Sequence, residues 1–183
     1  SLLVRVAACD HHRWNIANPT YFSENQSNGT TPTDELSPKE SAQIIVNHVI
    51  KGVEIAKKNK LPDRVIDFIR THHGTSYVRY FYNKQMEITT EFAPSDFMYN
   101  GPKPFSKETA ILMMCDSVEA ASKSLKDPTS TKINEFVDTI IANQIEAAQF
   151  LNANITFKEI ESIKKVLKHK LANMYHLRIE YPE

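Results

Sequence analysis

Apolar residues recur at every third or fourth position along most of this chain, the spacing that places side chains on one face of an α-helix. Alternating apolar and polar residues, which mark a half-buried strand, are scarce, and the chain has only four glycines. These patterns predict an all-α domain built as a helical bundle. The predicted helices cover residues 38–59, 62–73, 106–125, 131–151 and 156–174, and a further helical piece precedes Trp14.

Start and stop signals support several of these boundaries. The run Ser37-Pro38-Lys39-Glu40 combines an N-cap serine, a proline at the first helical position and a capping-box glutamate. Thr156 and Glu159 form a second capping box, and Gly74 follows residue 73 as a C-terminal stop. We therefore expect distinct helix ends at these places.

Two long polar segments separate the predicted helices. Residues 15–37 contain Asn18-Pro19, and residues 83–105 contain Gly101-Pro102, dipeptides that are typical of turns. Loops longer than about 15 residues are uncommon in compact domains and are usually functional. We expect both segments to be functional loops.

Length and charge narrow the class of protein. A chain of 183 residues is typical of one domain, and we expect residues 1–183 to form one. Its 22 basic and 22 acidic residues cancel, which argues against DNA, RNA or an anionic membrane as a partner. Two cysteines and the lack of a long apolar run predict a cytosolic chain that does not itself cross a membrane. Because it starts at Ser1 within an apolar segment, we interpret it as a fragment truncated on its N-terminal side.

Histidines are concentrated in the first 73 residues, which hold five of the seven: His11, His12, His48, His72 and His73. His48 falls among apolar residues of a predicted helix, where a core histidine bonded to a carbonyl is one interpretation. His72 and His73 end the next helix. For this pair the corresponding interpretation is that of polar residues that complement the helix dipole. These interpretations treat the histidines one by one and do not explain why they are grouped in the sequence.

Together the histidines indicate a metal site. Asp116 lies in the otherwise apolar run from Ile111 to Val118, and a carboxylate buried there needs a cation or hydrogen-bond donors; a surface acid is the alternative. Imidazoles and a carboxylate that converge inside a helical bundle favour a transition metal over magnesium or calcium. The sequence therefore predicts a nitrogen and carboxylate metal centre.

The order of these residues resembles the metal-dependent phosphohydrolases of the HD-domain family. More narrowly, several phrases are similar to the cytoplasmic HD domain of bacterial seven-transmembrane HD receptors. These phrases are Asn18-Pro19-Thr20-Tyr21-Phe22-Ser23-Glu24-Asn25-Gln26, Asp34-Glu35-Leu36-Ser37-Pro38, His72-His73-Gly74-Thr75, Gly101-Pro102-Lys103-Pro104, Asp116-Ser117-Val118-Glu119-Ala120 and Arg178-Ile179-Glu180-Tyr181-Pro182. They span nearly the whole chain.

The resemblance implies an activity and a set of ligands. Members of that receptor family hydrolyse cyclic di-AMP to the linear dinucleotide, so a cyclic dinucleotide is the implied substrate. Two divalent transition metals, iron or manganese, would activate the attacking water, and no catalytic group beyond that water is implied. By motif, the implied metal ligands are His11, His48, His72, His73 and Asp116.

The resemblance also implies the surroundings of the domain. It would be the cytoplasmic domain of a bacterial inner-membrane protein, in contact with the membrane only through an N-terminal region that this chain lacks. One further ligand histidine of the family falls in that region. A second copy of the chain is a candidate partner.

One short block departs from the family pattern. Family members read approximately His-Asp-Ile-Gly-Lys, whereas this chain reads His11-His12-Arg13-Trp14-Asn15. His12 takes the place of the metal-bridging aspartate, and an imidazole cannot bridge two ions as a carboxylate does. One ion, or none, is therefore the alternative expectation for this chain. Compensating frame shifts or a sequencing error explain so short a block as well as real divergence does.

Other candidates follow from the same comparison. Lys103, in the Gly-Pro-Lys-Pro loop, could reach a phosphate, and Arg79, near several tyrosines, could clamp an adenine; solvation and core packing are the alternatives. We treat Cys9 and Cys115 as small apolar residues. Three rival functions remain: a degenerate HD domain that binds a nucleotide or relays a signal without turnover, another HD nucleotide hydrolase, and a helical domain without metal.

Overall fold

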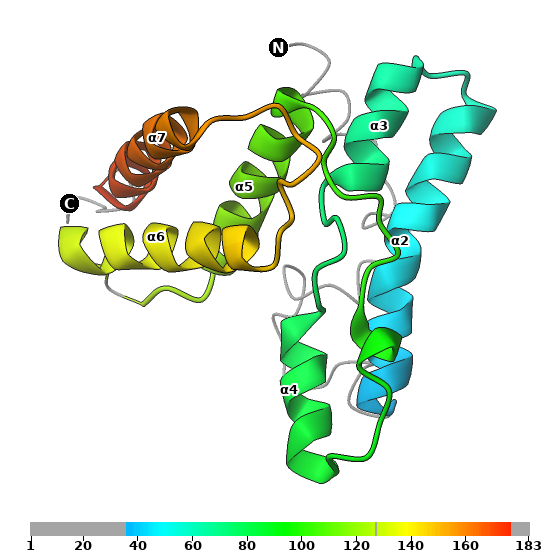
Figure 1. Cartoon of the computed structure of the whole chain (residues 1–183). Helices are drawn as coiled ribbons and strands as arrows, with labels where there is room; N and C mark the ends of the chain where they lie inside the picture. Colours follow the sequence, from blue (N-terminus) through cyan, green and yellow to red (C-terminus); the bar gives the residue numbers. More distant parts are fainter. Residues whose placement is uncertain (1–35, 127, 177–183) are drawn as a thin grey trace, which may run out of the picture. The chain divides into compact units, whose positions relative to one another are not determined.

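The computed structural model describes residues 36–126 and 128–176, and this part of the chain confirms the all-α prediction. It contains α2 (Pro38–Lys58), α3 (Asp63–Thr71), α4 (Arg79–Ile88), the 3₁₀ helix η4 (Pro94–Phe97), α5 (Lys107–Ser122), α6 (Ser130–Glu146) and α7 (Phe157–His176) (Figure 1). Across these residues the sheet pairing amounts to an isolated antiparallel bridge between Tyr77 and Met98. The helical piece predicted before Trp14 lies outside the described residues.

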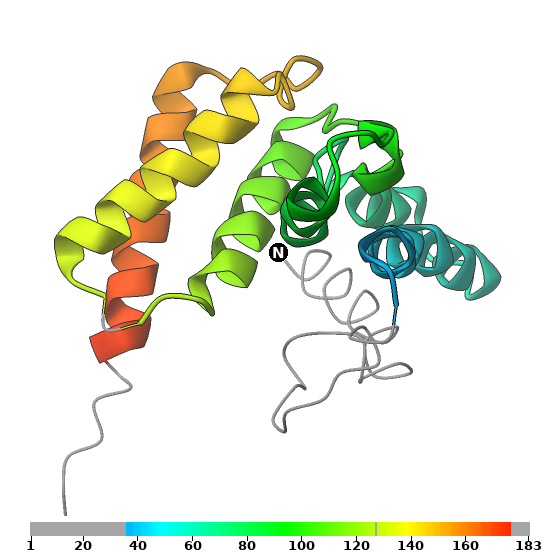
Figure 2. The same cartoon turned by 90° about the horizontal axis from the view of Figure 1, so that it is seen from below.

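The chain divides into two compact units, one up to Pro102 and one from Lys103 onward. In the first, α2 packs against α3, α4 and η4. Its apolar core combines residues of α2 with residues that follow α3: Ala42, Val46, Val78, Phe81, Phe97 and Tyr99. In the view of Figure 2, α2 is seen nearly end-on. This unit carries the histidines of the predicted site.

The capping box predicted at the start of α2 is present. The Ser37 hydroxyl accepts a hydrogen bond from the Glu40 amide at 3.3 Å, and the Glu40 carboxylate accepts one from the Ser37 amide at 2.9 Å. These bonds satisfy donors that the first turn of a helix otherwise leaves free. The same reciprocal pair joins Thr156 and Glu159 ahead of α7.

The approach of α3 to α2 depends on Gly52. A Cβ atom placed at Gly52 would lie 3.0 Å from Cγ2 of Ile69, closer than ordinary contact. Gly52 lies one helical turn after His48, and Ile69 lies one turn before His72 or His73. The absence of a side chain therefore permits close helix packing next to the histidines.

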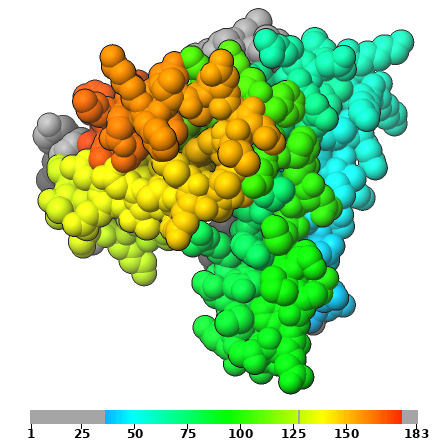
Figure 3. Space-filling model, viewed as in Figure 1, coloured from blue at the N-terminus to red at the C-terminus, as the bar shows by residue number. Residues whose placement is uncertain are grey.

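The second unit has its own core. It is made by α5, α6 and α7 around Met113, Met114, Val118, Val137 and Ile141. Figure 3 shows α6 and α7 side by side at the surface. Lys164 and Lys168 of α7 both form ion pairs with Asp138 of α6, at 2.9 and 2.7 Å.

Two sequence-based boundaries were wrong. Residues 83–88 belong to α4 rather than to a loop, because Phe81 on this helix is buried in the core of the first unit. α6 ends at Glu146 rather than at residue 151, because the chain turns at Ala148, whose φ is +52°. The second polar segment is therefore shorter than predicted, and it includes η4.

No helix within residues 36–126 and 128–176 is long and apolar enough to cross a membrane.

We predict that Gly52→Leu destabilises the first unit by about 1–3 kcal/mol, the usual cost of overpacking a close contact. Gly52→Ala is the comparison variant. Its single methyl group meets Cγ2 of Ile69 at 3.0 Å, so it should cost less than leucine, and a gain of about 1 kcal/mol in helix propensity offsets part of that cost. Chemical unfolding measures both variants. Equal stability of Gly52→Leu and the parent chain would show that α2 and α3 are not held at this contact.

Candidate metal centre

Three imidazoles converge where α2 passes the end of α3. His48 comes from α2, while His72 caps α3 and His73 follows it. One ring nitrogen from each lies within 4.8 Å of the others. His48 and His72 are buried, at 3% exposure each, and His73 is half-buried. The described residues thus contain the three-histidine part of the predicted ligand set.

Hydrogen bonds to backbone carbonyls determine which nitrogen of His48 and His72 carries the proton. Nδ1 of His48 contacts the carbonyl of Ile45, and Nδ1 of His72 contacts the carbonyl of Ile69 at 2.7 Å. A carbonyl only accepts, so each Nδ1 is the donor. Each Nε2 therefore presents a lone pair, the form in which imidazole binds metals.

The two Nε2 atoms face one another across 3.3 Å. Two lone pairs at this separation repel each other unless a cation lies against both. Nitrogen atoms of two imidazoles bound to one ion at about 2.1 Å lie about 3.0–3.4 Å apart for angles between square and tetrahedral. The pair therefore has the spacing of two ligands on one ion, and the nitrogen donors fit a transition metal.

Burial lowers the basicity of His48. Loss of solvation lowers the pKa of His48 to about 4, while its bond to the Ile45 carbonyl acts in the opposite direction. His48 is therefore neutral at pH 7, and protons do not compete with a metal for its Nε2.

The sequence after α3 explains how two consecutive histidines reach one place. Gly74 has φ +53°, a left-handed conformation that glycine adopts without a steric penalty. Its amide donates to the carbonyl of Thr71 at 3.0 Å, which ends the helix. The ring centroids of His72 and His73 lie 3.9 Å apart. The turn thus brings His73 next to His72 although neighbouring residues on a helix point in different directions.

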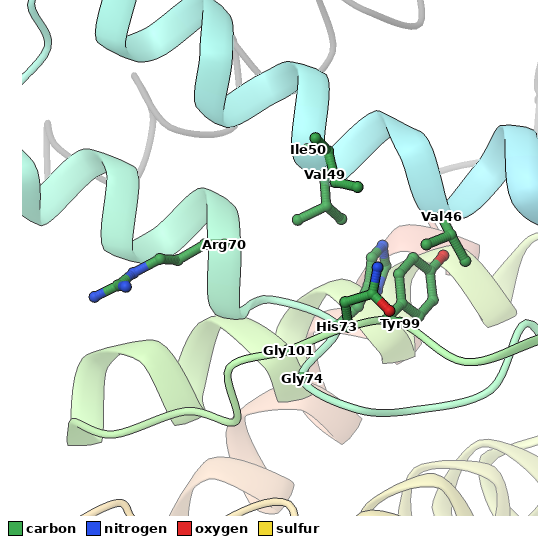
Figure 4. A pocket seen from close by; sticks show the side chains of 9 residues that line it. Val46, Val49, Ile50, Arg70, His73, Gly74, Tyr99 and Gly101 are labelled. Carbon is green, nitrogen blue, oxygen red and sulfur yellow. The ribbon is translucent and has the colours of Figure 1, made fainter. Parts of the chain in front are cut away.

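A small hollow of about 30 Å³ opens beside His73. Apolar side chains of α2, Val46, Val49 and Ile50, line one side (Figure 4). The rings of His73 and Tyr99 lie next to each other there, and Arg70 extends away from them. The hollow is thus lined both by His73 and by residues 99–101.

The remaining predicted ligands have different outcomes. His11 and His12 lie outside the described residues, so their part in the site stays a prediction. Asp116 is half-buried on α5 and belongs to the second unit. Burial raises the pKa of the Cys115 thiol, and the nearby charge of Asp116 raises it further. The role of Asp116 as a ligand is likewise still a prediction.

The two predicted substrate-binding residues have contrasting surroundings. Nζ of Lys103 donates to the carbonyl of Ala148 at 3.1 Å, at the C-terminal end of α6. This is a favourable place for a cation, since helix C-termini carry partial negative charge. Arg79 is exposed in the first turn of α4. Binding of substrate by either residue remains a prediction.

Tyr99 and the role of Gly52 were not predicted from the sequence. Tyr99 follows Met98 within the segment that we expected to be a loop, and its burial at 8% exposure arises from tertiary contacts. The one available signal was the large aromatic residue next to the Gly-Pro-Lys-Pro phrase.

Comparisons with known proteins identify relatives of this chain. The sequence pattern of the HD domain matches residues 3–121. The chain is 43% identical over 183 residues to the cyclic-di-AMP phosphodiesterase PgpH of Listeria monocytogenes and 41% identical over 182 residues to PgpH of Bacillus subtilis. It spans about a quarter, 26%, of the length of each.

Solved structures give the same result. The crystal structure of the L. monocytogenes PgpH HD domain in complex with cyclic-di-AMP superposes with a TM-score of 0.89 at 42% identity, covering 95% of this chain and 81% of that one. A second crystal structure of that domain gives a TM-score of 0.87 at 42% identity, covering 96% of this chain and 82% of that one. The chain matches this domain both in its fold and in its sequence, and it therefore belongs to the HD-domain family.

Proposed function

We propose that this chain is the catalytic domain of a metal-dependent phosphodiesterase that hydrolyses cyclic di-AMP to the linear dinucleotide. The observation that carries the proposal is the facing Nε2 pair of His48 and His72, 3.3 Å apart, with His73 beside it. Similarity to a phosphodiesterase whose HD domain was crystallised with cyclic-di-AMP supports the choice of substrate.

The residues of this chain would hold the metal and keep it accessible. His48, His72 and His73 would bind it through neutral imidazoles, and Asp116 and His11 would complete the ligand set. When bound, divalent iron or manganese lowers the pKa of water and offsets charge on phosphate oxygens. The carbonyls of Ile45 and Ile69 orient the rings of His48 and His72 toward the metal.

We further propose that residues 1–183 act as a single HD domain on the cytoplasmic side of a longer bacterial inner-membrane protein. Support comes from the relatives, of which the chain corresponds to about a quarter. We include in this proposal that two copies of the chain associate as a homodimer.

His12 favours a second candidate function. An imidazole in the place of the bridging aspartate would weaken the assembly of two ions, leaving a domain that binds a nucleotide or relays a signal without turnover. The two candidate functions differ in whether a second metal ion binds and in whether product forms. Both properties can be measured on the same protein.

We predict that His48→Ala and His72→Ala each weaken manganese binding by at least about 100-fold. Even groups that only orient a ligand account for about 10- to 100-fold in metal affinity. Elemental mass spectrometry after equilibrium dialysis measures the bound metal. His169→Ala is the control, since His169 is exposed on α7 and bonds to Asn173. Retention of manganese by both site variants would exclude the proposed centre.

We predict that Asp116→Asn also lowers the metal content, because the amide removes the negative charge and binds the ion weakly. Glu119→Gln, on the same helix but exposed, is the matched control. If His48→Ala loses metal while Asp116→Asn keeps it, Asp116 is not a ligand and its half-burial has a structural cause.

We predict that His12→Asp raises the metal content by about one ion per chain and increases hydrolysis of cyclic di-AMP with manganese. A carboxylate can bridge two ions, whereas a neutral imidazole binds one ion through one nitrogen. Chromatography of the linear dinucleotide measures turnover. Cyclic di-AMP bound by the parent chain without product, and product formed by His12→Asp, would assign the parent to the non-catalytic candidate.

A further inference from the structure

Tyr99 lies against the histidine cluster, although the family resemblance does not place it among the implied metal ligands. Its ring stacks on that of His73, with centroids 4.2 Å apart and planes inclined by 23°. It also meets His48 edge to face at 5.9 Å. Figure 4 shows the rings of His73 and Tyr99 next to each other. With 8% of Tyr99 exposed, the aromatic ring is held in place by the core of the first unit.

The backbone ties Tyr99 to the turn that carries His73. The His73 carbonyl accepts hydrogen bonds from the Ser76 amide at 3.1 Å and the Ser76 hydroxyl at 2.7 Å. The Ser76 carbonyl in turn accepts the Tyr99 amide at 2.9 Å. The antiparallel bridge between Tyr77 and Met98 reinforces this pairing. The ring and the backbone of Tyr99 are therefore placed relative to the same short turn.

His73 lies in a different local structure from the other two histidines. His48 and His72 are directed by carbonyls three residues earlier, in α2 and α3. His73 lies beyond the C-cap of α3, in the turn that contains Gly74, and it is the most exposed of the three. A flat aromatic ring across one face of the imidazole restricts its rotation, and stacked pairs contribute beyond their buried area.

We propose that Tyr99 is a positioning residue, whose ring holds His73 in the orientation that binds the metal. This inference rests on the proposed function, because it takes His73 to be a metal ligand. In this role Tyr99 acts through His73. The geometry assigns the role to the face of the ring, so phenylalanine should replace tyrosine and an aliphatic residue should not.

The test compares Tyr99→Leu, Tyr99→Phe and Phe81→Leu in titrations with Co²⁺ alone. Phe81 is the matched control because it is buried to the same degree, at 7% exposure, in the same apolar cluster. We expect Tyr99→Leu to weaken Co²⁺ binding about 10- to 100-fold and to change the visible spectrum of the bound ion. Tyr99→Phe and Phe81→Leu should bind within about 3-fold of the parent chain.

A measurement without metal separates this inference from the proposed function. Two-dimensional NMR of the histidine side chains, assigned with His73→Gln, reports the ring current that Tyr99 exerts on His73. We expect the His73 signals to move in Tyr99→Leu and to stay in Phe81→Leu. If the parent chain binds no Co²⁺, the proposed function fails while these signals still decide whether Tyr99 orients His73.

Three results would overturn the inference. Unchanged Co²⁺ binding and unchanged His73 signals in Tyr99→Leu would remove the role of Tyr99. Equal losses in Phe81→Leu would assign the effect to a loosened core, and equal losses in Tyr99→Phe would assign it to the hydroxyl group. If Tyr99→Leu does not fold by circular dichroism, Tyr99→Met repeats the comparison with a side chain that fills space without a flat ring.

Discussion

The close contact between α2 and α3 is the constraint on which the histidine cluster depends. Gly52 allows Ile69 to approach the α2 backbone, because a Cβ atom there would lie 3.0 Å from Cγ2 of Ile69. His48 lies one turn away on α2, and His72 caps α3. The separation of the helix axes therefore determines the 3.3 Å between the two Nε2 atoms. A wider separation would place the two nitrogen atoms too far apart to share the proposed ion.

Two interpretations of His48 that the sequence presented as alternatives are compatible in the structure. The Nδ1 side of the ring is that of a core histidine bonded to a carbonyl, and the Nε2 side faces His72, as the proposed metal site requires. The carbonyl bond makes ligation easier, because it places the proton on Nδ1 and leaves a lone pair on Nε2. Burial lowers the pKa of the same ring to about 4, so the lone pair stays available at neutral pH.

The second unit shows how strongly local signals determine a helical core. α5, α6 and α7 begin at hydroxyl or capping-box residues, Ser106, Thr129 and Thr156, and bury the apolar faces that their periodicity predicts. Lys103 contributes differently, because its ammonium group bonds to carbonyls at the end of α6. The Gly-Pro-Lys-Pro phrase did not indicate this structural partner of Lys103.

The sequence by itself determined the α-helices other than α4 among the described residues, several of their capped starts and the histidines from which the proposed site is built. These features are local: helical periodicity and capping boxes involve residues within one or two turns, so they can be read along the chain. α4 was missed because Phe81 on this helix is held by contacts with distant residues rather than by a start signal.

The tertiary structure alone decided the distances within the site. Ring orientation, the stack of Tyr99 on His73 and the role of Gly52 depend on residues that packing brings together from separate helices. Periodicity records which face of a helix is buried, but it contains no information on which neighbour covers that face or how closely. The chemistry of the imidazoles was therefore predictable from composition and order, whereas their arrangement for a cation was not.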